Sequence, residues 1–195
     1  MKRTKNSLKI TAILCVFLFL LSCDYDLTRS EKSGVVLTVV RIYGDDGTGG
    51  DADYLISDVD VGGTAFTDPI MVTLEAKFKK PVPLATTESY KTSVMIDRYT
   101  VTYMTSYNGG GTGGVDVPFA FEGSLSAVCE VEGTVDLDIL AVRAEAKTVA
   151  PLAGLAAPTV LPIVARFDFI GHDLGGNPVQ ATGYMTIYFS DWANP

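Results

Sequence analysis

Residues 34–190 alternate between apolar and polar side chains with a period of two, and glycine-rich or proline-rich segments interrupt the alternation at short intervals. Over residues 70–78, for example, every second residue is apolar and most of the residues between them are polar. Successive side chains of a strand point to opposite faces of a sheet, so this pattern is typical of half-buried strands in antiparallel sheets. The alternation therefore predicts an all-β fold.

The predicted strands follow one another closely along the chain. They are expected at residues 35–43, 54–61, 70–79, 94–104, 117–121, 125–131, 135–139, 163–170 and 179–189. The phase of the alternation slips at residues 139–140, which predicts a β-bulge. Residues 141–147 (AVRAEAK) are predicted to continue as a strand, with one or two helical turns as the alternative because Ala, Glu, Arg and Lys favour helix. About eight or nine short strands predict a β-sandwich.

This layout resembles an immunoglobulin-like antiparallel β-sandwich, as in bacterial surface domains and lipoproteins that end in a similar hairpin. The D-x-x-G-N hairpin stands here at residues 173–177. The resemblance depends on strand number and turn spacing, because the Cys-Trp-Cys core of antibody domains is missing from this sequence. It implies a fold and no activity.

The N-terminus predicts an address in the cell envelope. Four basic residues within the first nine precede an apolar run over residues 10–21. A helix that spans a bilayer needs ~20 apolar residues, so this shorter run indicates a secretory signal peptide. Leu20-Leu21-Ser22-Cys23 then resembles the lipobox of bacterial lipoproteins. That resemblance implies cleavage before Cys23, a thioether-linked diacylglycerol on its sulfur, and usually acylation of the new amine.

The chain is accordingly expected to have three parts. Residues 1–22 are a signal peptide that is removed, residues 23–33 are the lipidated Cys23 with a flexible tether, and residues 34–195 are one β-sandwich domain. Asp24 resembles the signal that retains lipoproteins in the inner membrane of enteric bacteria, but sorting differs between lineages, so the leaflet stays open. Loss of residues 1–22 removes four basic residues and no acid, which changes the net charge from -8 to -12.

Composition and motifs argue against several functions. With 15 basic against 23 acidic residues, the chain lacks the basic surface that nucleic acids require. His172 lies in a glycine-rich hairpin loop, and Cys129 alternates with apolar residues, so we expect a solvated turn residue and a buried thiol. The glycines of residues 108–114 lack the Lys and Ser/Thr of a phosphate-binding loop and predict a long hairpin loop instead. No catalytic residue is predicted.

Two groups of residues are candidates for binding. An acidic segment without Lys or Arg contains Asp45, Asp46, Asp51, Asp53, Asp58 and Asp60, followed by Asp68. Calcium prefers several oxygen ligands, so these residues are candidate metal ligands, with a solvated acidic loop as the alternative. Tyr184 and Tyr188 share one face of a predicted strand with Thr182 and Thr186. If exposed, that face could bind a glycan or a partner; if buried, it belongs to the core.

These inferences favour a non-enzymatic lipoprotein that acts in the cell envelope as a structural or protein-interaction module. It would contact the membrane through Cys23 and bind an envelope protein or a glycan, and it needs no cofactor other than a possible Ca²⁺ ion. The alternative is a calcium- or carbohydrate-binding surface domain. A hydrolase that uses paired carboxylates comes third.

Overall fold

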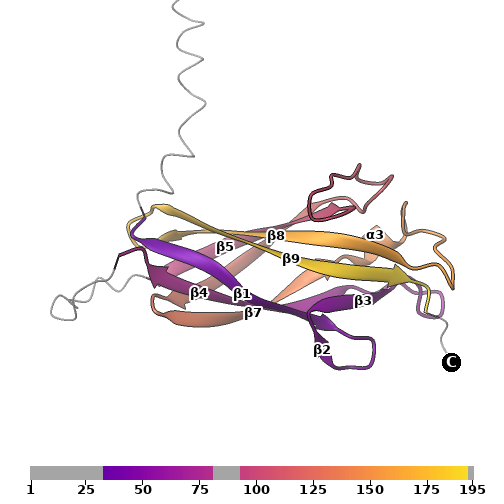
Figure 1. Ribbon diagram of the computed structural model, residues 1–195, viewed down its shortest axis with the longest axis horizontal. Coiled ribbons are helices and arrows are strands. Elements are labelled where there is room, and N and C mark those ends of the chain that lie inside the picture. The colour runs from indigo at the N-terminus through magenta and orange to yellow at the C-terminus, as the bar shows by residue number, and fades with distance from the viewer. Residues whose placement is uncertain (1–32, 81–92, 193–195) are drawn as a thin grey trace, which may run out of the picture.

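Two β-sheets packed face to face make up the described part of the chain, which in this computed structural model is residues 33–80 and 93–192 (Figure 1). The strands are β1 (Val35–Asp45), β2 (Asp51–Ala52), β3 (Tyr54–Asp58), β4 (Asp68–Phe78), β5 (Ser93–Met104), β6 (Phe121–Glu130), β7 (Gly133–Val142), β8 (Leu161–Asp173) and β9 (Pro178–Ser190), and the helical turn α3 (Ala144–Lys147) follows β7. The predicted signal peptide, Cys23 and the tether up to residue 32 lie outside the described residues. Within the described ranges, no helix is long and apolar enough to cross a bilayer.

The strand order is that of an immunoglobulin-like sandwich. One sheet has the order β2-β1-β4-β7 and the other β3-β9-β8-β5-β6. In the naming used for immunoglobulin domains, β1, β4 and β7 correspond to strands A, B and E, and β9, β8, β5 and β6 to G, F, C and C′. The chain changes sheets after β2, because β3 pairs with β9 of the other sheet. The β3–β9 pair is parallel, while all other pairs between strands are antiparallel. The predicted all-β sandwich is confirmed.

β-bulges shift the alternation within single strands. In β5 the register slips between Ile96 and Arg98, and the buried positions change there from even to odd numbers. In β7 the extra residue is Ala141, because Asp68 faces Val142 while Pro69 faces Leu140. This confirms the predicted bulge within two residues.

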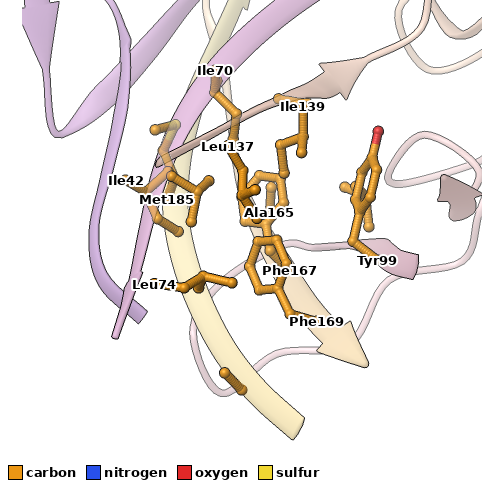
Figure 2. Packing of buried hydrophobic residues seen from close by; sticks show 14 of the residues in the cluster. Ile42, Ile70, Leu74, Tyr99, Leu137, Ile139, Ala165, Phe167, Phe169 and Met185 are labelled. Atoms are coloured by element: carbon orange, nitrogen blue, oxygen red, sulfur yellow. The ribbon is translucent and has the colours of Figure 1, made fainter. Parts of the chain in front are cut away.

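The core lies between the two inward faces. Figure 2 shows side chains of both sheets meeting there, among them Ile42, Ile70, Leu74, Leu137, Ile139, Ala165, Phe167, Phe169 and Met185. Two tyrosines of β5 also enter this core and reach the bulge of β7. The hydroxyl of Tyr103 donates to the carbonyl of Ala141 at 2.6 Å, and the hydroxyl of Tyr99 accepts from the amide of Leu140 at 3.1 Å. They bind backbone groups that lie at the bulge and thereby join the two sheets.

Three predictions about individual elements were wrong or incomplete. Residues 144–147 form α3 rather than a strand, as the alternative interpretation had it. Residues 117–120 are not a strand; Val117 forms an isolated bridge to Gly113, and β6 begins at Phe121. The pair β1–β2 was not predicted, because β2 has two residues and is too short to show alternation.

Candidate functional site

A group of tyrosines lies on the outward surface of the five-stranded sheet, over the half of β9 that runs from its middle to its end. We call it the tyrosine face, and it consists of Tyr54, Tyr107, Tyr184 and Tyr188. The parallel register of β3 with β9 places Tyr54 opposite Thr186. Tyr188 follows Thr186 two residues later along β9, so its side chain points to the same face. The rings of Tyr54 and Tyr188 meet edge to face at 5.8 Å, and those of Tyr107 and Tyr184 lie 6.0 Å apart.

The β5–β6 connection supplies Tyr107 and stands above the five-stranded sheet in Figure 1. Its glycines close the loop on itself: the amide of Gly109 donates to the carbonyl of Ser106, and the Thr105 hydroxyl donates to the carbonyl of Gly110 at 2.7 Å. The Tyr107 hydroxyl lies 3.4 Å from the hydroxyl oxygen of Thr186 on β9. The glycine-rich stretch is therefore a hairpin loop, as predicted, and it places an aromatic ring over the sheet.

The tyrosine face is accessible to a ligand. Tyr184 is 44% exposed and Tyr107 is 59% exposed, whereas Tyr54 and Tyr188 are half-buried. Edge-to-face and tilted contacts between rings restrict their orientation, so the face is ordered before a ligand arrives. Both tyrosines that were candidates from the sequence, Tyr184 and Tyr188, lie on this face.

The tyrosine face carries no net charge although the whole protein is acidic. β9 contains no Asp, Glu, Lys or Arg. On the adjacent β8, Arg166 and Asp168 face outward and bind each other at 2.9 Å, and the Thr182 hydroxyl donates to the same carboxylate at 2.6 Å. These charges are compensated within the sheet, so the face presents rings and hydroxyl groups rather than an ionic site.

The acidic candidates for a metal site do not converge. Asp45 accepts the amides of Gly47 and Gly49, and Asp46 accepts the amides of Thr48 and Gly50 and the Thr48 hydroxyl. The hydrogen bonds to Asp46 lower the pKa of its carboxyl group, and the bond from the Thr48 hydroxyl has the largest effect.

The remaining acids are dispersed in the same way. Asp58 and Asp60 accept backbone amides of the segment that follows β3, Asp51 belongs to β2, and Asp53 separates β2 from β3. In the described part of the chain, no three acidic, His or Cys side chains are grouped as metal ligands. The observed role of Asp45, Asp46, Asp58 and Asp60 is to close turns.

Asp68 has a different role, which the sequence did not indicate. Its carboxylate lies 2.9 Å from the Lys147 ammonium and accepts the Ser57 hydroxyl at 2.6 Å. Lys147 also donates to the carbonyl of Asp58 at 2.7 Å, and its side chain is 1% exposed. Burial raises the pKa of Asp68, and Lys147 opposes that shift. Because Ser57 and Asp68 belong to different sheets, this cluster joins the two sheets and α3 at one end of the sandwich.

A pocket of about 390 Å³ lies beside this cluster. Leu152 and Leu155 of the β7–β8 connection form part of its wall, together with Asp60, Lys147 and Asp191. The ammonium of Lys147 is already bound to Asp68 and to the backbone. The pocket therefore has a partly apolar wall, and the ammonium of Lys147 is not free to act on a molecule bound there.

The residues that could serve in nucleophilic catalysis are separated. The ring of His172 binds the carboxylate of Asp97 at 2.9 Å on the surface, away from the thiol of Cys129 in the core. Cys129 is buried among core residues, and burial raises the pKa of its thiol. A reactive cysteine needs the opposite shift.

The sequence matches no protein-family model and no curated protein.

Proposed function

We propose that this chain is a non-enzymatic lipoprotein of the cell envelope, anchored to a membrane through Cys23, and that its sandwich binds an envelope component through the tyrosine face. The lipobox-like sequence at residues 20–23 supports the anchor. The exposed, mutually packed rings on β9 and the β5–β6 loop support the binding role. Tyrosines are enriched at binding surfaces, because each offers a large apolar body with a polar tip.

The position of the face suits an anchored protein. The described residues begin at Ser33, whose hydroxyl donates to Asp173 in the β8–β9 hairpin. This hairpin lies at the left end of Figure 1. Tyr188 lies ten residues beyond Pro178 along β9, which corresponds to roughly 33 Å at the rise of an extended strand. An anchor at Cys23 would therefore attach the sandwich at one end and present the tyrosine face near the other.

Metabolic labelling with a palmitate analogue tests the anchor. The native protein is expected to take up label and to fractionate with membranes, whereas Cys23→Ala is expected to do neither. Label that survives Cys23→Ala would refute the lipidation site.

Site-specific photo-crosslinking in intact cells tests the binding face. p-Benzoylphenylalanine in place of Tyr184 is expected to give a discrete adduct. The same group in place of Val40, which is 55% exposed on the opposite sheet, is the matched control and is expected to give none. Equal adducts from both positions, or none from position 184, would contradict the proposed binding role.

A further inference from the structure

We infer that the tyrosine face binds a neutral oligosaccharide that lies along β9, an inference that rests on the proposed binding role of this face. The rings of Tyr184 and Tyr188 stand four residues apart on one strand, or about 13 Å. Tyr107 contacts Tyr184, and Tyr54 lies opposite Thr186 and contacts Tyr188, so these two rings widen the row. The face is thus a row longer than one sugar ring, which matches a chain of sugars better than a monosaccharide.

The chemical groups along this row match those of a sugar chain. Sugar rings present apolar C–H surfaces that pack against aromatic rings, and hydroxyl groups that need partners of both donor and acceptor character. Thr186 lies between Tyr184 and Tyr188 on the same face, with its hydroxyl next to that of Tyr107. Gln180 and Thr182 continue the same face with further polar groups. Rings and hydroxyls therefore alternate along the strand.

Charge determines which class of sugar chain fits. The protein has a net charge of -8, and the one arginine that neighbours Tyr184 across the sheet, Arg166, is bound to Asp168. An anionic polysaccharide would meet a repulsive protein, and β8 and β9 offer it no Lys or Arg other than the paired Arg166. A neutral chain is not repelled by the acidic protein and needs no cation to pair with, since it replaces water at groups that are themselves uncharged.

The backbone of β9 argues against a peptide that adds to the sheet. β9 is an interior strand, hydrogen-bonded to β3 on one side and β8 on the other. At Tyr184 and Tyr188 the face consequently offers side chains and no free backbone groups, whereas strand addition would require the open edge of this sheet at β3. This feature favours a ligand that is recognised by stacking and by side-chain hydroxyls.

The experiment measures binding of the full-length, detergent-solubilised protein to neutral hexasaccharides of glucose, xylose, mannose and N-acetylglucosamine by isothermal titration calorimetry. Oligogalacturonate of the same length represents anionic chains. We expect at least one neutral hexasaccharide to bind and the oligogalacturonate not to bind. Tyr184→Ala should weaken the affinity about fivefold or more, whereas Tyr184→Phe should retain it because the ring remains.

Two further variants separate loss of the site from loss of the fold. Tyr107→Ala changes a loop residue outside the sheet and should weaken binding in the same way. Tyr43→Ala removes a half-buried tyrosine from the opposite sheet and should leave binding unchanged. No binding to any neutral hexasaccharide, preference for the anionic chain, or affinity unaffected by both Tyr184→Ala and Tyr107→Ala would overturn the inference.

The results also distinguish this inference from the proposed function. A position-184 adduct that is digested by protease, together with no saccharide binding, would overturn the oligosaccharide and leave the interaction module standing. Absence of both the adduct and saccharide binding would overturn both.

Discussion

Replacing Lys147 by Met tests whether the Lys147–Asp68 pair holds the end of the sandwich together. The Lys147 ammonium lies 2.9 Å from Asp68 and its side chain is 1% exposed, while the side chain of Asp68 is 15% exposed. Met keeps the apolar stem but leaves the Asp68 carboxylate buried without its cation. Breaking a buried pair by removing one partner costs ~3–5 kcal/mol. For a chain of this size, that loss corresponds to a fall in melting temperature of roughly 6–20 °C.

The same variant should acquire a distinctive pH dependence. Burial raises the pKa of Asp68 above its ordinary value of 3.8, and Lys147 opposes that shift. In Lys147→Met the ammonium group that lowers the pKa of Asp68 is gone. The pKa of Asp68 in the folded state therefore rises further, while its pKa in the unfolded state stays the same. A group whose folded pKa is raised contributes stability at low pH that is lost as the pH rises through the folded pKa. The stability deficit of Lys147→Met should therefore be smaller at pH 5 than at pH 7.

Urea unfolding followed by circular dichroism at both pH values measures this effect. The double variant Lys147→Met/Asp68→Asn serves as the control, because it removes the uncompensated charge and keeps an acceptor for Ser57. It should recover most of the lost stability and show no additional pH dependence from this site. A single variant within ~1 kcal/mol of the native protein at both pH values, or additive effects in the double variant, would refute the reasoning.

Three further predictions concern the core, the thiol and the acidic loops. Gly123→Ala should destabilise the fold by about 1–3 kcal/mol in urea unfolding, since the added methyl group would overlap the buried ring of Tyr99; a neutral effect would show that the ring has room to move. Cys129 should resist alkylation in the folded protein and react in denaturant, because burial raises the pKa of its thiol; rapid labelling under native conditions would show the thiol to be accessible. Millimolar Ca²⁺ should leave the melting temperature unchanged, because the described acids do not group as metal ligands; a clear rise with Ca²⁺ that a chelator reverses would contradict this.

Periodicity was sufficient for most strands because burial of one face of a strand is a local property of the sequence. It failed at residues 144–147, where Ala144 and Ala146 continue the apolar alternation of β7 and yet belong to α3. The decisive contact there is between Lys147 and Asp68, which are far apart in the sequence. A lysine that is buried because a distant carboxylate binds it leaves no mark in local alternation. The same contact explains why Asp68, a candidate cation ligand by its neighbours, is an ion-pair partner instead.

The tyrosine face was only partly predictable for a related reason. Tyr184 and Tyr188 share a face because they are four residues apart on one strand, and this spacing can be read from the sequence. Tyr54 joins them through the parallel pairing of β3 with β9, and Tyr107 through a loop that folds over the sheet. Other tyrosines of similar spacing, Tyr99 and Tyr103, are buried in the core. Spacing identifies which residues share a face, but strand order determines whether that face meets solvent.

If Cys23 anchors the domain as proposed, the distribution of charge would orient the tyrosine face relative to the membrane. β1 starts at the end of the sandwich where the anchor would attach, and the acidic segment of residues 45–60 follows in the half toward the opposite end (Figure 1). Anionic lipid headgroups repel carboxylates within about a Debye length of ~8 Å at physiological ionic strength. The acidic end would therefore be held away from the bilayer, and the neutral tyrosine face near that end would be held away with it. Lys or Arg substitutions at Asp51 and Asp53, which lie outside the tyrosine face, would weaken this repulsion and should increase adsorption of the domain to anionic vesicles without changing binding at Tyr184.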